Sequence, residues 1–589
     1  MNNQKSAFAN RPAQETANPE ADGRQPFIHM KKKLLYISIA AFTSLFSGCT
    51  NDFEKVNVNP NVVTDVDVRL LFTSSLVPMQ TSRGGEYWNE GFTHFLSACQ
   101  LVTGQTYAVA TTAVNARYKL FYTSVLPNLV EIRRLIALKP DKEKFEQINA
   151  ISYIPQIMMA LKVTDMNGSM PYTEANKGRD EGLYNPKFDN QETLFNLWLK
   201  ELSDAIATLQ KDLPNQVNFG SNDVFYNGNV TRWIKLANSL KLRIAARIQN
   251  QDPATATRVF KEVMADAVGP ISSNDDQLIH KNPVYYPFGI DGYNIDIYSR
   301  HFAVGTAIEF MKSSSDPRLG IYYDKNSLTG SFKDTLTKYN RVLPSWVNMD
   351  DPNIMYQGGP ADFQSNPAVS SYFVNPFNAG GSNRYQLIST VNRKFFAPTV
   401  DQGSGTVVDV MFSYAEVCFH IAEFIQKGYG SGIDTKGTAE DWYKKGIRAS
   451  AMSMNDIAIA ANSNSYSDLA ARIDAHLANP KVKFDGTHDL EKIYIQALLN
   501  FYRDPNEAFL LARRTGYPKF NSTLLAREII ADKFLPRRWW TLDPGEVNRA
   551  NWNAAMVEQG FTPNDFSIEV LASERIWFDK KSPDYGMGN

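Results

Sequence analysis

The sequence predicts a mainly α-helical protein, in which a scaffold of paired helices carries one large region of irregular structure. Apolar residues recur at spacings of three and four over much of the chain, which is the pattern of helices with one buried face. Several helical segments follow one another as pairs, and pairs stacked in series form an α-solenoid of the tetratricopeptide type. No strict repeat of about 34 residues is visible, so helix pairing alone predicts the solenoid.

The clearest helix spans Arg232–Ile248. Its apolar side chains share one face, since they recur every three or four residues: Trp233, Ala237, Leu240, Ile244 and Ile248. The same spacing predicts helices over Tyr414–Ile425 and Leu490–Phe501. Further helices are expected at residues 67–80, 117–137, 144–164, 191–210, 254–266, 303–312 and 438–457.

Local sequence signals predict both ends of a helix between Asp504 and Gly516. Asp504 suits the N-cap and Pro505 the first helical position, while Glu507 falls where a capping box needs an acidic side chain. Gly516 is typical of a helix C-terminus, and Arg513 and Arg514 precede it. We expect these arginines to bind carbonyl or carboxylate groups, because buried polar groups need partners. For the same reason we expect Asn238 and Arg243 to bond neighbouring loop carbonyls.

The region from about residue 270 to 405 is rich in Gly, Pro, Asn, Ser and aromatic residues and has few long periodic runs. A structureless insert of this length in a compact protein is usually functional or disordered, and the aromatic content argues against disorder. The sequence therefore predicts folded loops and short hairpins packed on the helical scaffold.

The N-terminal part contains a signal-peptide pattern at residues 30–48. Three lysines at positions 31–33 precede an apolar run from Leu34 to Phe46, and Ser47-Gly48-Cys49 follows as a cleavage site with small residues. The apolar run is shorter than the roughly 20 residues that a membrane-spanning helix needs. Cys49 resembles the lipid-bearing cysteine of bacterial lipoproteins.

These features predict the domain organisation. Residues 1–29 form an upstream extension, 49–66 a lipidated tether, and 67–589 a single domain. Once Cys49 carries lipid, Cys99 and Cys418 remain, and Cys418 lies in an apolar helical pattern typical of a buried thiol. A disulfide between these two cysteines is the alternative.

Composition and motifs argue against several classes of function. The net charge of −1 gives no concentrated cationic surface for nucleic acid. The sequence contains no HExxH, CxxC or GxSxG motif and no phosphate-binding glycine loop, so we predict no catalytic residue and no metal site. Two alternatives stay open: Glu416 and His420, one helical turn apart, as metal ligands, and Asp165 and Glu174 as the carboxylate pair of a glycoside hydrolase.

One segment carries the clearest family signature. TDMNGSMPYTEA (Thr164–Ala175) resembles the Asp-x-x-Gly-x-x-Pro-Tyr-x-Glu-Ala motif of the SusD/RagB nutrient-binding lipoproteins, in particular their second SusD-like subfamily. Other segments similar to the family follow in order: NVNPN (Asn57–Asn61), RWIKLANSLKLRIAARI (Arg232–Ile248), SDPRL (Ser315–Leu319), SYAEVCFHIAEFIQKGY (Ser413–Tyr429), YKKGIRAS (Tyr443–Ser450), EAFLLARRTGYP (Glu507–Pro518) and LPRRWW (Leu535–Trp540).

The resemblance implies a function without catalysis or a cofactor. Members bind a glycan or peptide at the surface of the bacterial outer membrane and close as a lid over a TonB-dependent transporter of the SusC type. Asp52 and Glu54 resemble the acidic surface-export signals of Bacteroidetes lipoproteins; an ordinary polar tether is the alternative. A surface-anchored glycan-degrading enzyme and a surface adhesin are the competing functions.

Ligand-binding candidates come from the aromatic-rich segments. Flat aromatic rings suit the apolar faces of sugars, and polar neighbours fix orientation. The candidate platforms are Trp88, Tyr293, Trp346, Tyr356 and Tyr385. The candidate hydrogen-bonding residues are Asp291, Asn294, Asn383 and Arg384. Packing in the protein core is the alternative role for each of these aromatic side chains.

Overall fold

The computed structural model describes residues 66–79, 83–104, 116–285, 301–328, 330–362, 366–374, 377–380, 382–399, 402–530 and 535–589. The chain divides into two compact units, Met1–Val66 and Asp67–Asn589, and the fold below belongs to the second. Cys49, the signal segment and the tether lie outside the described residues. Among the helices of the described ranges, none combines the length and apolarity needed to cross a membrane.

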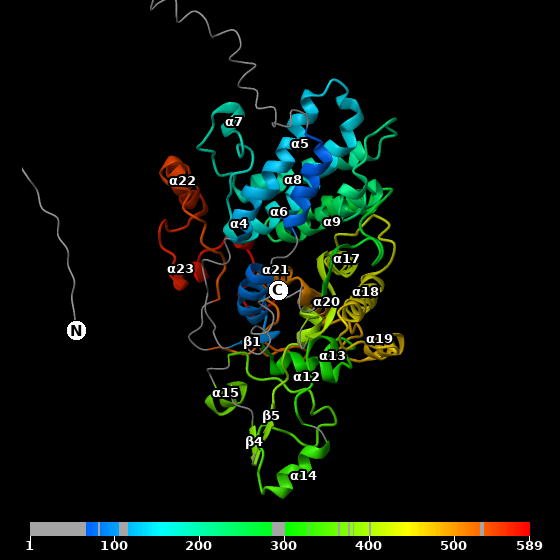
Figure 1. Cartoon of the computed structure of the whole chain (residues 1–589), viewed down its shortest axis with the longest axis vertical. Coiled ribbons are helices and arrows are strands. Elements are labelled where there is room, and N and C mark those ends of the chain that lie inside the picture. The colour runs from blue at the N-terminus through cyan, green and yellow to red at the C-terminus, as the bar shows by residue number, and fades with distance from the viewer. Residues whose placement is uncertain are drawn as a thin grey trace, which may run out of the picture. The chain divides into compact units, whose positions relative to one another are not determined.

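Antiparallel helices packed in sequence build one part of the domain (Figure 1). The contacts run from α3 (Val68–Leu76) to α5 (Leu126–Leu138), then to α6 (Glu146–Asn167), α8 (Gln191–Leu209), α9 (Val230–Ile248) and α10 (Pro253–Ala265). Each helix touches the next, which is the packing of an α-solenoid. The predicted fold class is confirmed.

Shorter elements connect these helices. They are η1 (Val77–Met79), the π-helices η2 (Arg83–Leu96) and η3 (Phe121–Val125), α4 (Ala116–Leu120), η4 (Lys142–Phe145), α7 (Gly178–Glu181) and η5 (Gly220–Asn222).

A second helical layer packs on α9 and α10. It consists of α17 (Tyr414–Gln426), α18 (Ala439–Ala460), α19 (Leu469–Ala478), α20 (Asp489–Asn500), η8 (Phe501–Arg503) and α21 (Pro505–Thr515). Its central helix is α17, which contacts α9, α10, α18 and α20. The side chain of Ser413 caps α17, and Thr438 with Asp441 forms a capping box on α18. Local sequence thus starts both helices, and burial of their apolar faces holds them.

The ends of α21 lie where the sequence predicts them. The helix begins at Pro505 and stops at Gly516, which takes the left-handed φ of +74°. The predicted capping box is wrong, because the side chain of Asp504 accepts no cap hydrogen bond. The Glu507 carboxylate instead turns into the core and accepts a hydrogen bond from Arg247.

The irregular region holds short helices and paired strands. The helices are α12 (Gly305–Ser313), α13 (Leu319–Tyr322), α14 (Gly330–Lys338), α15 (Pro367–Val374) and α16 (Arg393–Phe396). Antiparallel pairs join β1 (Val102–Gly104) to β3 (His301–Ala303), and β4 (Phe377–Gly380) to β5 (Asn383–Tyr385). The elements α14, β4 and β5 lie together at the lower end of the domain in Figure 1.

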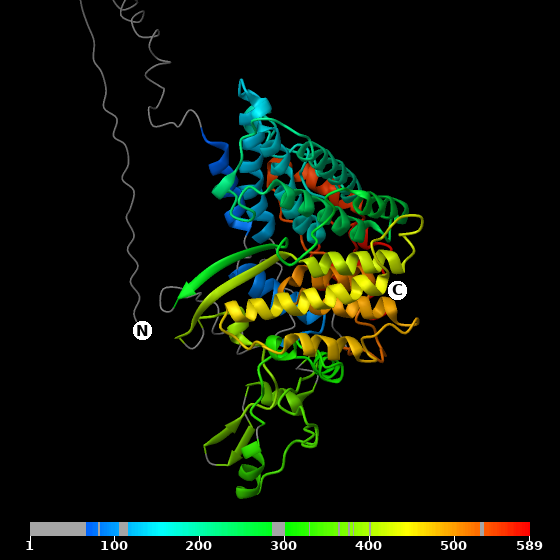
Figure 2. The same ribbon diagram turned by 90° about the vertical axis from the view of Figure 1, so that its right-hand side faces the viewer.

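The longest strands form a two-stranded ribbon. β2 (Leu278–Tyr285) pairs antiparallel with β6 (Ser404–Phe412), so that Lys281 lies opposite Val408. Figure 2 shows this ribbon beside α18, which β6 contacts. The strands are separated by more than a hundred residues of sequence, so the ribbon is not a local hairpin.

The turn at Gly168 and Ser169, which follows α6 and is called the signature turn below, contacts the C-terminal segment. That segment contains η9 (Glu546–Asn548), α22 (Arg549–Gln559), α23 (Ile568–Ser573) and η10 (Trp577–Asp579). Gly168 has a φ of +76°, and a Cβ there would lie 2.0 Å from Oε1 of Gln559. That oxygen accepts a hydrogen bond from the Ser169 amide at 2.8 Å. The turn therefore needs glycine both for its conformation and for the close approach of α22.

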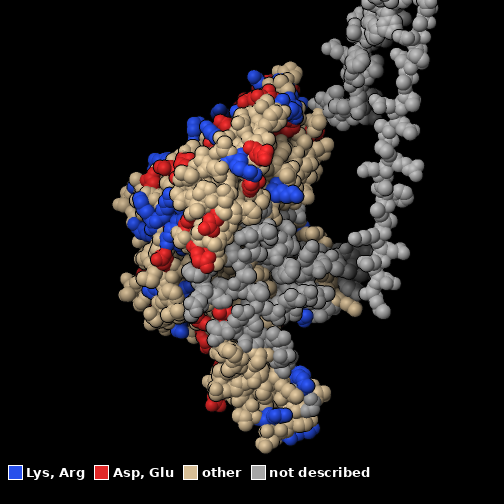
Figure 3. All heavy atoms as spheres, turned by 90° about the vertical axis from the view of Figure 1, so that its left-hand side faces the viewer, with Lys and Arg blue, Asp and Glu red and all other residues tan. Residues whose placement is uncertain are grey.

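Cys99 and Cys418 are both buried as free thiols, so the alternative disulfide is not formed. On the surface, Figure 3 shows basic and acidic side chains intermixed over the helical part of one face. Mixed charges do not attract a polyanion strongly, in agreement with the net charge of −1.

Candidate functional site

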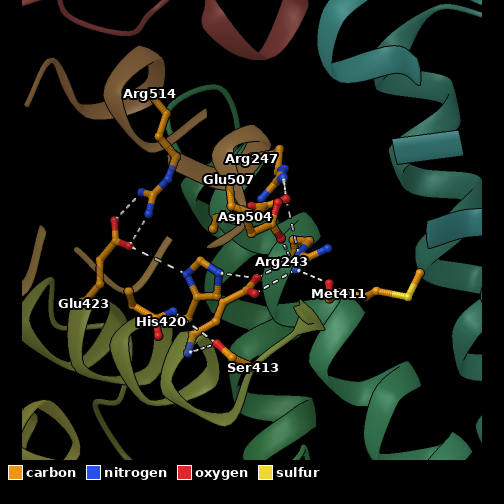
Figure 4. Close-up of polar contacts among 12 residues, drawn as sticks. Arg243, Arg247, Met411, Ser413, His420, Glu423, Asp504, Glu507 and Arg514 are labelled. Carbon is orange, nitrogen blue, oxygen red and sulfur yellow. Dashed lines mark hydrogen bonds and ion pairs between the residues drawn. The ribbon is translucent and has the colours of Figure 1, made fainter. Parts of the chain in front are cut away.

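A buried layer of ion pairs joins α6, α9, α17 and α21 (Figure 4). Arg243 makes a two-pronged contact with Glu416, at 2.7 Å for both oxygens. Arg247 binds Glu507 at 2.6 Å and Asp165 at 3.2 Å. These guanidinium groups are only 2% exposed, so each depends on its carboxylates rather than on water.

The same layer continues along α17. Arg514 donates to both oxygens of Glu423, at 2.6 and 2.7 Å. Burial alone would raise the pKa of Glu423, but Arg514, His420 and Lys427 outweigh it and hold that pKa well below its usual range. At Asp504 the pKa is raised, to about 7, by burial and by the charge of Glu507.

The expected partners of the motif residues are largely those observed. Asn238 donates to the carbonyl of Gly269 at 3.2 Å, as predicted. Arg243 also reaches a carbonyl, that of Met411 at 3.3 Å, but its main partner is the Glu416 carboxylate. The guanidinium of Arg513 donates to the carbonyls of Asp165, at 2.6 Å, and Arg537.

The residues proposed for the alternative metal site and for the alternative carboxylate pair make structural contacts. Asp165 is fully buried against Arg247, whereas Glu174 accepts the amide of Lys187 at 2.8 Å in an exposed contact. Glu416 and His420 lie within the ion-pair layer, with 3.4 Å between His Nε2 and Glu Oε1. Within the described ranges, no cluster of three or more His, Cys, Asp or Glu side chains has the arrangement of a metal site. A buried, paired carboxylate is poorly placed to meet a substrate.

A cavity of about 370 Å³ lies between Gln100, the segments that follow α21 and the C-terminal residues. We call it the Tyr585 pocket. The residues that line it and matter most for recognition are Gln100, Phe520, Arg527, Glu528, Arg537 and Tyr585.

The aromatic ring of Tyr585 lies against two guanidinium groups. The Cζ atoms of Arg537 and Arg527 are 4.6 and 5.5 Å from the ring centroid, which is cation–π geometry. The Tyr585 hydroxyl donates to the carbonyl of Pro536 at 2.9 Å. Burial raises the pKa of Tyr585 to about 12, so the hydroxyl stays protonated and the ring stays fixed.

Arg537 is held by an ion pair and by a hydrogen bond to the backbone. Its Nε lies 2.9 Å from Oδ2 of Asp579, and its Nη2 donates to the carbonyl of Pro583 at 3.0 Å. Among the described residues, its Nη1 has no hydrogen-bond partner, although the residue is 2% exposed. The carbonyl of Arg537 accepts from Arg513, so α21 positions this residue.

The opposite wall is fixed by hydrogen bonds between one side chain and the backbone. The side-chain amide of Gln100 donates to the carbonyl of Glu528 at 2.8 Å and accepts its backbone amide at 2.7 Å. The Glu528 carboxylate accepts the amide of Ala361 at 2.9 Å, and burial raises its pKa. The Tyr585 pocket thus combines aromatic surface, guanidinium groups packed on a ring and a carboxyl group on a rigid frame.

Three of the sequence-predicted ligand residues, Trp346, Tyr356 and Tyr385, do not line the Tyr585 pocket. Trp346 and Tyr385 pack in a small apolar cluster of the irregular region. The Tyr385 ring is 4.5 Å from that of Phe332, and its hydroxyl bonds Thr335 at 3.1 Å. Tyr356 packs against the main core. All three are half-buried, and their role as ligand platforms stays a prediction.

Two of the remaining candidates lie on a short strand, and one lies in a helix. Asn383 and Arg384 lie on β5, and Arg384 is exposed. Trp88 lies within η2. Asp291, Tyr293 and Asn294 fall outside the described residues.

Sequence reasoning missed Phe520 and Tyr585, because neither belongs to a periodic pattern or to an aromatic-rich segment. The LPRRWW segment, which supplies Arg537, was the available signal.

Comparisons with known proteins agree with the fold. A family model for a second group of SusD-like proteins, described as starch-binding and associating with the outer membrane, matches residues 60–540. No curated protein is similar enough to count as a match.

Solved structures are similar over nearly the whole domain. A chitin-binding protein is 23% identical with a TM-score of 0.64, over 87% of this chain and 100% of its own. A SusD homolog from Bacteroides fragilis is 20% identical with a TM-score of 0.62, over 87% and 100%. A chitin-binding SusD homolog from Flavobacterium johnsoniae is 20% identical with a TM-score of 0.59, over 88% and 100%. At these identities the likeness establishes the fold, and since the family model covers residues 60–540, the chain belongs to the SusD-like family.

Proposed function

We propose that this protein is a cell-surface lipoprotein that binds a glycan and delivers it to an outer-membrane transporter, without turning it over. The observation that carries the proposal is the match of residues 60–540 to a family described as starch-binding and associating with the outer membrane. Two of the similar structures are of proteins named as chitin-binding.

The Tyr585 pocket supports binding of a sugar. Its volume of about 370 Å³ lies within the range of about 300–1,000 Å³ typical of small-molecule sites. Phe520 and Tyr585 offer aromatic surface for the C–H face of a pyranose, and Glu528 brings a carboxyl group to the same lining. The frame of the pocket is preorganised, which lowers the entropic cost of binding.

The sequence supports the location and the partner. Cys49 at the end of the signal peptide would carry the lipid that holds the protein at the bacterial outer membrane, with the ligand face outward. A SusC-type TonB-dependent transporter is the proposed partner, over which the protein would act as a lid. Replacing Cys49 by Ser should move the protein from the membrane fraction to the soluble fraction.

Binding to the Tyr585 pocket is tested with defined ligands. Calorimetry with maltohexaose, chitohexaose and a control hexapeptide measures affinity for the wild-type protein and for Phe520→Ala. We expect one saccharide to bind and the variant to lose about tenfold in affinity, since a sugar–aromatic contact is worth about 1–1.5 kcal/mol. Tyr184→Ala is the matched control, because Tyr184 is 71% exposed and lies outside the pocket.

Three outcomes would contradict the proposal. Binding of the peptide alone would exclude a glycan as the ligand. Equal affinity of the wild type and Phe520→Ala would exclude this pocket. Release of shorter saccharides by the purified protein would favour the enzyme alternative, and chromatography of the calorimetry samples detects it. For the transporter, affinity purification of the membrane-bound protein should recover a large β-barrel protein.

A further inference from the structure

The hydrogen-bond donors that line the Tyr585 pocket are buried in its walls. Arg537 and Arg527 are 2% and 6% exposed, and Arg537 already holds an ion pair and a backbone carbonyl. Both ends of the Gln100 side-chain amide are bonded to the backbone of Glu528. These groups shape the walls but are not offered to a ligand, which must therefore supply donors of its own.

Glu528 offers a hydrogen-bond acceptor. Its side chain is half-buried, and Oε2 accepts the amide of Ala361 at 2.9 Å. No hydrogen bond to Oε1 is formed within the described residues, and this oxygen is not among the sealed polar atoms of the core. Burial raises the pKa of this carboxyl and the Ala361 amide lowers it, and no charged side chain of the described part contributes. Oε1 is thus an accessible acceptor without a counter-charge.

The other carboxyl of the lining lies at the rim of the pocket. The Asp584 side chain is 78% exposed and forms an ion pair with Arg575. A ligand with carboxylate or sulfate groups would be repelled by Glu528 and Asp584, and the guanidinium groups of the lining are too deeply buried to attract it. The pocket therefore favours a ligand without negative charge.

Three aliphatic side chains complete the lining. Ile530, Leu535 and Ala572 are half-buried and line the same cavity as the rings of Phe520 and Tyr585. We call these three side chains the aliphatic wall. A ring suits the C–H face of a pyranose, but the rest of an unsubstituted hexose carries hydroxyl groups, which the aliphatic wall would leave without hydrogen bonds. A methyl group next to an N–H donor would match both the wall and the accessible acceptor, and that combination is an acetamido group.

We propose that the Tyr585 pocket selects a 2-acetamido sugar such as N-acetylglucosamine, whose acetamide N–H donates to Oε1 of Glu528 and whose methyl group packs on the aliphatic wall. This selectivity rests on the proposed function and deepens it, because it names the class of glycan that the same pocket takes. An unsubstituted hexose would leave the aliphatic wall unused. A protonated amino sugar would pair with Glu528 but would bring no methyl group to the wall.

Chitotetraose and cellotetraose test this selectivity, because they share the same β-linked pyranose chain and differ only in the substituent at C2. Calorimetry measures the affinity of the wild type for each. The acetamide hydrogen bond should contribute about tenfold in affinity and burial of the methyl group about fourfold. We therefore expect chitotetraose to bind about fortyfold more tightly than cellotetraose.

Two variants separate the two contacts. Glu528→Gln keeps an acceptor for the Ala361 amide but turns an N–H group toward the ligand, so the preference for chitotetraose should fall to about fourfold. Ala572→Leu fills the space that the methyl group needs, so the preference should fall to about tenfold. Glu192→Gln on α8 is the matched control and should keep the preference of the wild type, because Glu192 is exposed and does not line the pocket. Thermal unfolding checks that each variant is folded.

The results separate failure of the selectivity from failure of the proposed function. Equal affinity for chitotetraose and cellotetraose, weakened for both by Phe520→Ala, would overturn the selectivity and leave a general glycan site. Tighter binding of tetraglucosamine than of chitotetraose would assign a protonated amine instead. A preference for chitotetraose that survives in both Glu528→Gln and Ala572→Leu would exclude these contacts as its cause. Binding of the control hexapeptide and of neither saccharide would contradict the proposed function itself.

Discussion

Arg247 of α9 donates to Glu507 of α21 across the core, with 2.6 Å between Nη2 and Oε1. Glu507 also lies 3.6 Å from Arg243, so one carboxylate serves two guanidinium groups. Ion pairs as well as apolar packing therefore join α9 of the solenoid to α21 of the second layer.

Replacing Glu507 by Gln should destabilise the protein strongly, because Arg243 and Arg247 would remain charged in the core with fewer counter-charges. The expected loss in the free energy of unfolding is about 3–5 kcal/mol, measured by urea denaturation. Asp474→Asn breaks a surface pair with Arg448, in which the Asp474 side chain is 64% exposed, and should cost less than about 1 kcal/mol. Similar losses in both variants would contradict a structural role for the buried layer.

Asp504 should make stability depend on pH. Its pKa is raised from 3.8 to about 7 by burial and by the charge of Glu507. Between these values the native protein keeps a proton that the unfolded chain loses, so the contribution of Asp504 to stability falls as pH rises. Asp504→Asn should match the wild type near pH 4 and be about 4 kcal/mol more stable at pH 8. Thermal unfolding of both proteins at several pH values measures the difference. A constant difference across the pH range would exclude the assignment.

The signature turn should tolerate no side chain at Gly168. A Cβ there combines a φ of +76° with a clash against Gln559, so Gly168→Ala should lose about 2–4 kcal/mol. Gly182 has a similar φ of +66° with no atom within 4 Å of an added Cβ, and Gly182→Ala should cost only about 1 kcal/mol. Equal losses for both variants would mean that backbone strain alone, and not the contact with α22, governs the turn.

The thiols of Cys99 and Cys418 should not react with thiol reagents in the native protein. Burial raises the pKa of Cys99 and of Cys418 to about 12, which suppresses the reactive thiolate. In a Cys49→Ser background, a thiol reagent such as DTNB should label both cysteines in urea and neither under native conditions. A reducing agent should leave the melting temperature unchanged. Rapid labelling of the native protein would show that one of these segments opens easily.

Patterns of burial made the helices predictable. The spacing of Trp233, Leu240 and Ile248 predicted α9 to within two residues, because a helix with one buried face repeats its apolar side chains at that interval. The capping box at Asp504 failed for a tertiary reason. The carboxylate of Glu507 satisfies Arg247, a residue 260 positions away, and no local rule includes that demand.

The β2–β6 ribbon and the candidate binding surface were harder to predict, since their parts are far apart in sequence. The ribbon pairs Lys281 with Val408, and neither strand forms a hairpin that a turn signal could reveal. The aromatic residues chosen from the irregular region, such as Trp346 and Tyr385, pack against their neighbours in a small core. Composition identifies segments rich in rings, but only the folded chain decides which rings stay open.

The pairing of Gln100 with Glu528 has a consequence for how the protein is made. These residues are 428 positions apart, and Tyr585 lies a further stretch along the chain, near its C-terminus. A polypeptide that emerges from its N-terminus therefore completes the Tyr585 pocket last, after the helical solenoid has all its residues. Truncation after residue 570 would thus remove Tyr585 and leave every residue of both helical layers in place.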